Sequence, residues 1–137
     1  MSNSFDMRSI KILLIDDEPF IRQTLRHILI QIGLPSSNIY EAESAGTGQN
    51  EAMRMRPSLV FCDIHMPIAD GFTFLDNLRK CPMATVAATP VVMLTSDASE
   101  EAVLSAKNHK VSGYLVKPVS INNVKKAIER ALKVTLP

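Results

Sequence analysis

The stretch SLVFCDIHMPIADGF, residues 58–72, decides the fold expected for this chain. Its apolar run LVFC leads directly into Asp63, and a loop with a proline and a glycine follows. An unbroken apolar run of this length is typical of a strand buried on both faces of a parallel sheet. A carboxylate at the end of such a strand costs free energy unless something compensates it. Asp63 therefore has either a cationic partner or a chemical role.

The bulk composition is that of a globular chain. The 137 residues suit a single domain over 1–137, with a core of about 10–132. The chain is 46% hydrophobic and 21% charged, which excludes wholesale disorder. The formal net charge of +1 gives no overall field toward nucleic acid or membranes. We therefore expect neither direct nucleic-acid binding nor membrane insertion.

The N-terminal residues and the two cysteines indicate a cellular compartment. The opening residues MSNSFDMRS lack the apolar segment of a signal peptide, and no apolar run approaches the length of a membrane span. Cys62 and Cys81 are too few for a disulfide framework, so both are expected to be reduced. We expect a cytoplasmic protein.

Apolar runs and helical patterns alternate outward from residues 58–72. Strands are expected at 10–16, 38–42, 58–63, 90–96 and 113–118. Helices are expected at 18–32, 45–55, after Gly71, at 99–107 and over 121–132, and residues 82–89 are expected to be irregular. Strict alternation implies right-handed βαβ units. The predicted fold is α/β, a doubly wound five-stranded parallel sheet flanked by five helices.

Polar side chains stand where four of the predicted strands end. They are Asp16-Asp17-Glu18, Asp63, Thr95-Ser96 and Lys117. Because the carboxyl ends of parallel strands meet at one edge of the sheet, we expect these side chains to converge. Two carboxylates about 5 Å apart repel by roughly 3 kcal/mol at an effective dielectric near 20. Such a cluster either raises a pKa or recruits a cation, and oxygen ligands select a hard metal such as Mg²⁺.

The same set of groups suggests phosphoryl transfer. A metal ion, an ammonium and a hydroxyl would neutralise charge that spreads over phosphoryl oxygens. Asp63 would then be the nucleophile and would form an aspartyl phosphate.

Four segments resemble the receiver domain of bacterial two-component response regulators, in that family's order and with similar spacing. They are LLIDDEP, LVFCDIHMPIADGF, VVMLTS and GYLVKP. Each segment alone is a weak signal, whereas four together, each at the end of a predicted strand, are specific. The resemblance extends over about residues 10–132 and is to single-domain receivers of the chemotaxis type. It implies the flavodoxin-like strand order 2-1-3-4-5.

The resemblance implies catalytic and switch roles for particular residues. Asp63 would be the phosphoacceptor, Thr95 would hydrogen-bond the phosphoryl group and Lys117 would pair with it. Tyr114 would be the aromatic switch residue that turns inward when Thr95 moves. The peptide bond between Lys117 and Pro118 would be cis.

The resemblance also implies a metal site with Mg²⁺ as cofactor. Asp17 and Asp63 would bind the ion through their side chains, Asp16 would act through a bound water, and the backbone carbonyl of His65 would complete the protein ligands. His65 and Asp97 would flank the phosphorylation site and set the lifetime of the phosphorylated state.

The expected function is a signalling switch and not a separate enzyme. A histidine kinase or a histidine phosphotransfer protein would donate the phosphoryl group, and the chain would catalyse only its own phosphorylation and dephosphorylation. The change would be read by an unknown downstream protein on the face formed by residues 99–107, 113–118 and 121–132. The sequence departs from the family pattern at one position on this face. Lys110 stands where many receivers carry a glycine suited to a left-handed helix cap.

Three alternatives stay open at this point. A Mg²⁺-dependent aspartate-nucleophile phosphohydrolase would need a D-x-D motif after the first strand, and residues 16–19 read Asp-Asp-Glu-Pro. An intermediate in a multi-step phosphorelay would use the same site. A degenerate receiver that acts as a scaffold would normally lack the acids that this chain retains.

Overall fold

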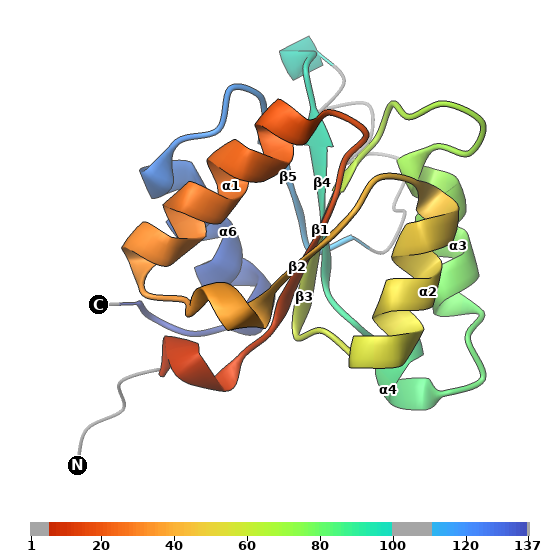
Figure 1. The fold of residues 1–137 in the computed structure, drawn as a ribbon, viewed down its shortest axis with the longest axis horizontal. Coiled ribbons are helices and arrows are strands. Elements are labelled where there is room, and N and C mark those ends of the chain that lie inside the picture. Colours follow the sequence, from red (N-terminus) through yellow and green to blue (C-terminus); the bar gives the residue numbers. More distant parts are fainter. Residues whose placement is uncertain (1–5, 100–110, 137) are drawn as a thin grey trace.

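The computed structural model describes residues 6–99 and 111–136 and forms a five-stranded parallel sheet (Figure 1). The strand order is β2-β1-β3-β4-β5. The strands are β1 (Ile12–Ile15), β2 (Ile39–Ala42), β3 (Leu59–Asp63), β4 (Val91–Thr95) and β5 (Gly113–Val116). The α-helices are α1 (Pro19–Ile32), α2 (Ala45–Met55), α3 (Gly71–Arg79), α4 (Ala84–Ala87) and α6 (Ile121–Leu132), and two 3₁₀ turns are η1 (Met7–Ser9) and η2 (Ser36–Asn38). The doubly wound fold and the predicted strand order are confirmed.

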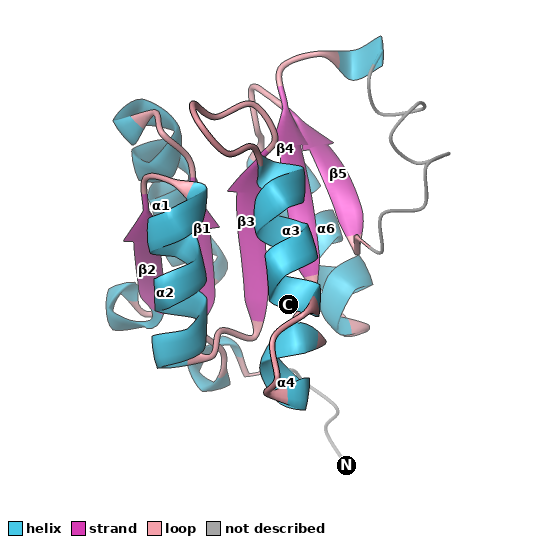
Figure 2. Ribbon diagram, turned by 90° about the vertical axis from the view of Figure 1, so that its right-hand side faces the viewer, coloured by secondary structure: helices cyan, strands magenta, loops and turns pink. Residues whose placement is uncertain are grey.

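Helices cover both faces of the sheet. Figure 1 shows α1 and α6 on one side and α2 and α3 on the other, and Figure 2 shows the strands running in one direction behind α2 and α3. Alternate residues of β1 enter two different cores: Ile12 and Leu14 join the α1/α6 cluster, whereas Leu13 and Ile15 join the α2/α3 cluster. All four side chains are fully buried. This two-sided burial is the reason that the strands read as unbroken apolar runs.

Helix α2 forms although its two glycines lower its intrinsic propensity. Ser44 and Thr47 form a reciprocal capping box at its start. A side-chain carbon at Gly48 would collide with Ile15, so this glycine lets the helix approach β1 closely. Packing against the sheet therefore compensates for the weak local signal.

One predicted segment is wrong, and another lies outside the described residues. The stretch 82–89, expected to be irregular, contains the one-turn helix α4. Arg79 donates hydrogen bonds to the carbonyls of Ala87 and Thr89 at 2.9 and 2.8 Å, and so holds the end of this helix. A single turn is too short for hydrophobic periodicity to reveal it. The helix expected at 99–107, apart from Ser99, and the position of Lys110 lie outside the described residues. Across residues 6–99 and 111–136, no helix combines the length and the apolar character that a membrane crossing requires.

Candidate functional site

The strand ends bring the predicted polar residues to one edge of the sheet. Asp63 ends β3 opposite Leu94 of β4, and Thr95 is the last residue of β4. The backbone N–H of Lys117, just after β5, donates to the Thr95 carbonyl at 2.7 Å. The N–H of Asp16, just after β1, donates to the carbonyl of Ala42 at 3.1 Å. The register of the sheet therefore places all four residues at its carboxyl edge.

Four carboxylates form a cluster that we call the acidic cup. Its members are Asp16, Asp17, Glu18 and Asp63, and each offers an oxygen within 4.8 Å of the others. Asp16 and Asp63 are buried, whereas Asp17 and Glu18 are exposed at the rim. The cup thus has a buried floor and an open side.

A glycine shapes the β3–α3 loop next to the acidic cup. The N–H of Gly71 donates to the Ile64 carbonyl at 2.9 Å. A side-chain carbon at Gly71 would collide with the backbone carbonyl of Asp63. Gly71 therefore allows the loop to return directly onto the strand that carries Asp63.

Among the described residues, Lys117 is the cation that pairs with the carboxylates of the acidic cup. Its Nζ lies 3.0 Å from Asp16 Oδ2, 3.2 Å from Asp63 Oδ1 and 3.5 Å from Glu18 Oε1, and its side chain is 8% exposed. Burial by itself would lower the pKa of Lys117, but the hydrogen bonds and charges of Asp16 and Asp63 outweigh burial and raise it. The ammonium therefore stays protonated at neutral pH.

One ammonium does not compensate the charge of the cup. Burial, and then the charge of Asp16, raises the pKa of Asp63 to about 6, although Lys117 acts in the opposite direction. Burial also raises the pKa of Asp16. Asp16 Oδ2 is buried and accepts no hydrogen bond of normal geometry, although Lys117 Nζ is at ion-pair distance. The floor of the cup carries excess negative charge that a further cation would stabilise.

The donor set of the cup fits Mg²⁺. Its ligands are oxygens, and Mg²⁺ commonly uses one or two carboxylates together with water and phosphate oxygens. Asp16 Oδ2 is a buried acceptor that shares the Lys117 ammonium with Asp63 and Glu18. His65 lies two residues beyond Asp63, on the exposed part of the β3–α3 loop, and the ligand role of its carbonyl stays a prediction.

Thr95 and Tyr114 lie on the neighbouring strands β4 and β5, and their roles stay predictions. The buried hydroxyl of Thr95 accepts a hydrogen bond from the Asp97 N–H at 3.1 Å. Tyr114 lies opposite Met93, packs partly buried against the α2/α3 cluster, and has a pKa raised by burial. The peptide bond between Lys117 and Pro118 is cis, as the resemblance implies.

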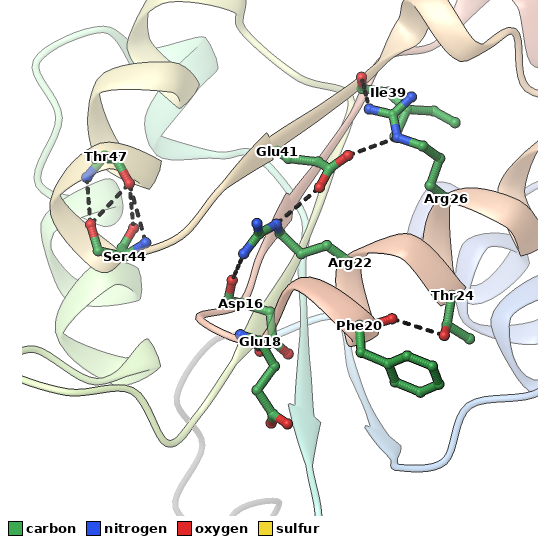
Figure 3. Close-up of polar contacts among 10 residues, drawn as sticks. All are labelled: Asp16, Glu18, Phe20, Arg22, Thr24, Arg26, Ile39, Glu41, Ser44 and Thr47. Atoms are coloured by element: carbon green, nitrogen blue, oxygen red, sulfur yellow. Dashed lines mark hydrogen bonds and ion pairs between the residues drawn. The ribbon is translucent and has the colours of Figure 1, made fainter.

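Two residues with contacts at this site received no role of their own from the sequence. Glu18 is a rim partner of Lys117, whereas the sequence showed it only as the third acid after a strand. Arg22 of α1 donates to the carbonyl of Asp16 and also to Glu41 Oε1 of β2 (Figure 3). The pair of Arg22 and Glu41 is 19 residues apart in the chain, so no local pattern indicates it.

Comparisons with known proteins agree with this geometry. The family model of the response regulator receiver domain matches residues 12–129. The KDP operon transcriptional regulatory protein KdpE of Escherichia coli is 30% identical over 122 residues, which are 89% of this chain and 51% of KdpE. The sensory transduction protein LytT of Enterococcus faecalis is 30% identical over 125 residues, 89% of this chain and 48% of LytT. The chain therefore spans about half the length of these two relatives.

Similarity also extends to chemotaxis proteins of comparable length. Chemotaxis protein CheY-3 of Vibrio cholerae is 28% identical over 123 residues, 90% of this chain and 92% of CheY-3. The solved structure of the chemotaxis response regulator CheY4 of Vibrio cholerae has a TM-score of 0.77 and 29% identity, and the match covers 90% of this chain and 98% of that one. Because the family model covers most of the sequence, the chain belongs to the response regulator receiver domains, the phosphorylation-dependent switches of two-component signalling.

Proposed function

We propose that residues 1–137 form one receiver domain in which Asp63 accepts a phosphoryl group from a histidine kinase or a histidine phosphotransfer protein. The observation that carries this proposal is the carboxylate of Asp63, buried at the end of β3 in the acidic cup, with Lys117 Nζ at 3.2 Å. An oxygen of Asp63 would attack phosphorus. A P–O bond would form as the P–N bond breaks, and the electron pair would leave with the imidazole nitrogen.

The acidic cup would hold Mg²⁺ during this transfer. Asp17 and Asp63 would supply side-chain oxygens, His65 its backbone carbonyl, and Asp16 would act through a water. Bound Mg²⁺ supplies charge neutralisation at phosphoryl oxygens. The close approach of four carboxylates, three of which share the Lys117 ammonium, supports this assignment.

Thr95, Lys117 and Tyr114 would convert phosphorylation into a change of shape. The Lys117 ammonium would contact the phosphoryl group, and the Thr95 hydroxyl would hydrogen-bond it. The backbone N–H of Lys117 donates a hydrogen bond to the Thr95 carbonyl. Movement of Thr95 would therefore be transmitted to the end of β5, the strand that contains Tyr114. Phosphorylation shifts this equilibrium only by its difference in affinity for the two states.

The output would be read by a downstream protein on β5 and α6, together with residues 99–107. The receiver family consists of signalling switches and not of classical enzymes. The activity of this chain would be limited to its own phosphorylation and dephosphorylation. Cys62 and Cys81 are free, which supports the cytoplasmic location that we propose.

His65 and Asp97 would set the lifetime of the aspartyl phosphate. Hydrogen bonds from Ser99 are the main cause of the lowered pKa of Asp97, and a smaller contribution comes from His65. The two side chains are therefore close enough to interact beside the site. Replacing either residue by Ala should alter the rate at which phosphate is lost, and unchanged rates for both would exclude this role.

The chemistry is tested by incubation with acetyl phosphate and Mg²⁺, followed by intact mass measurement. Wild type should gain one phosphate-sized adduct, and Asp63→Asn should gain none. Asp76→Asn, which removes an exposed acid of α3 outside the cup, should behave as wild type. Chelation of Mg²⁺ should suppress the adduct. An adduct on Asp63→Asn, or none on wild type, would refute the assignment of Asp63.

A further inference from the structure

We propose that Arg22 is a positioning residue that holds the β1–α1 turn in the geometry in which Asp16 and Asp17 can bind a divalent cation. The inference rests on the proposed function, because it concerns the metal site of the acidic cup. Arg22 lies outside the cup and would act through the backbone of Asp16. It is the side chain that joins the cup to β2 and α1 (Figure 3).

Hydrogen bonds hold Asp16 at three atoms, and its Oδ2 pairs with Lys117 Nζ at 3.0 Å. Its N–H donates to the Ala42 carbonyl at 3.1 Å, and its Oδ1 accepts the Glu18 N–H at 2.9 Å. Its carbonyl accepts a hydrogen bond from Arg22 Nη1. Since β1 ends at Ile15, a side chain and not another strand supplies this third contact. The orientation of the peptide between Asp16 and Asp17 therefore depends on Arg22.

The geometry of α1 explains why Arg22 can reach this carbonyl. Side chains on a helix lean toward its N-terminus, and Arg22 stands four residues after the N-cap residue Glu18. Its Nε donates to Glu41 Oε1 at 2.9 Å, while Nη1 of the same planar guanidinium donates to the Asp16 carbonyl. The Arg22 side chain is only 16% exposed. Glu41 thus orients the guanidinium, and the guanidinium orients the turn.

Arg26 provides a matched comparison in the same network. Its Nε donates to the second oxygen of Glu41 at 2.7 Å, and its two terminal nitrogens donate to the carbonyls of Ser36 and Ile39. Figure 3 shows Arg26 directed along β2 toward Ile39, whereas Arg22 is directed toward Asp16. Both arginines share one carboxylate and the same helix, but their backbone contacts differ. If Mg²⁺ binding weakens on substitution of Arg22 but not of Arg26, the loss therefore reflects the contact of Arg22 with the turn.

Calorimetric titration with Mg²⁺ of the full chain measures this difference. Arg22→Met should bind Mg²⁺ at least tenfold more weakly than wild type, since removal of a residue that orients a metal ligand typically costs about 10–100-fold in affinity. Arg26→Met should change the affinity less than about twofold. Arg22→Lys should be intermediate, because an ammonium cannot reproduce the planar two-point contact.

Amide hydrogen exchange gives a second measurement that needs no metal. In the metal-free protein, the Glu18 amide should exchange about tenfold faster in Arg22→Met than in wild type, because its acceptor Asp16 is less fixed. It should be unchanged in Arg26→Met. Circular dichroism of each variant establishes that the fold is retained, and Arg22→Lys carries the comparison if Arg22→Met does not fold.

The outcomes separate this inference from the proposed function. Wild-type affinity in Arg22→Met, or equal losses in Arg22→Met and Arg26→Met, would overturn the role of Arg22. Absence of Mg²⁺ binding in wild type would instead overturn the proposed metal site. In that case the exchange rates of the Glu18 amide still decide whether Arg22 holds the turn.

Discussion

Two clusters of charge meet at Asp16 and Arg22, and they differ in how their carboxylates are compensated. The acidic cup has four carboxylates and contacts one ammonium, and two of its acids are buried. The second cluster, which we call the arginine bridge, consists of Glu41 between Arg22 and Arg26, and both oxygens of Glu41 are bonded, at 2.9 and 2.7 Å. In the bridge each oxygen of the carboxylate has its own guanidinium partner, whereas in the cup three carboxylates share the Lys117 ammonium. This difference in charge compensation distinguishes the two clusters.

The carboxyl pKa values of the two clusters move in opposite directions. Burial would raise the pKa of Glu41, but hydrogen bonds from Arg26 and Arg22 outweigh it, and the pKa falls below its usual value. Burial and the neighbouring Asp16 raise the pKa of Asp63 to about 6. Ionisation of Glu41 therefore stabilises the folded state, whereas ionisation of Asp63 destabilises it. Four experiments would challenge or refine this contrast.

Lys117→Met should have the largest effect on stability. Removing one partner of a buried ion pair leaves charge uncompensated and typically costs about 3 kcal/mol or more. We expect a loss of that size in the free energy of unfolding without metal, and a smaller loss in the presence of Mg²⁺. Urea denaturation with and without Mg²⁺ measures both values. The control is Lys126→Met, at an exposed position of α6; if the two variants lose the same stability, Lys117 is not compensating the cup.

The free energy of unfolding should decrease as the pH rises, because Asp63 ionises. The carboxyl has a pKa of about 6 in the folded chain against 3.8 for the ordinary group, so the folded state binds this proton more tightly. Between about pH 4 and 6, ionisation of Asp63 should remove on the order of 1–3 kcal/mol from the free energy of unfolding of the metal-free protein. The effect is absent below this range and complete above it.

The measurement for this pH dependence is the difference between wild type and Asp63→Asn, by urea denaturation at each pH. Taking the difference removes the contributions of titrating groups that do not interact with Asp63. The stability of Asp63→Asn relative to wild type should increase from pH 4 to 6. A constant difference over this range would contradict the raised pKa.

Asp17→Asn should separate metal binding from folding. The side chain lies at the exposed rim of the cup, so its neutralisation should change the stability of the metal-free protein by less than about 0.5 kcal/mol. Loss of a charged ligand should weaken Mg²⁺ binding by about tenfold or more, roughly 1.4 kcal/mol. Calorimetric titration measures the affinity, and Asp76→Asn is the control. Equal affinities for both variants would remove Asp17 from the ligand set.

Glu41→Gln should cost much less stability than Lys117→Met. Exposed ion pairs contribute about 0–1 kcal/mol and are screened by salt. The side chains of the bridge are 16–31% exposed, so we expect a loss of about 1 kcal/mol or less, which decreases further at high salt. Urea denaturation at low and high salt tests this. A loss as large as that of Lys117→Met would show that the two clusters do not differ as proposed.

The sequence predicted the strands and their polar ends because both signals are local. The buried runs of β1 and β3 stop at Asp16 and Asp63, and this boundary is visible without any partner strand. The short helix α4 was not predictable, since it depends on hydrogen bonds from Arg79. Arg22 was not predictable either, because an arginine on an amphipathic helix normally faces solvent.

Local pattern in the chain was sufficient to establish the alternation of strands and helices and the residue types at each strand end, because backbone geometry and hydrophobic periodicity act over a few residues. The charge balance of the site was a matter of three-dimensional packing. Lys117 reaches Asp63 across 54 residues of sequence, and Arg22 reaches Glu41 across 19. Burial and electrostatic interaction depend on separation in space, and the folded sheet alone brings these groups within 3.2 and 2.9 Å.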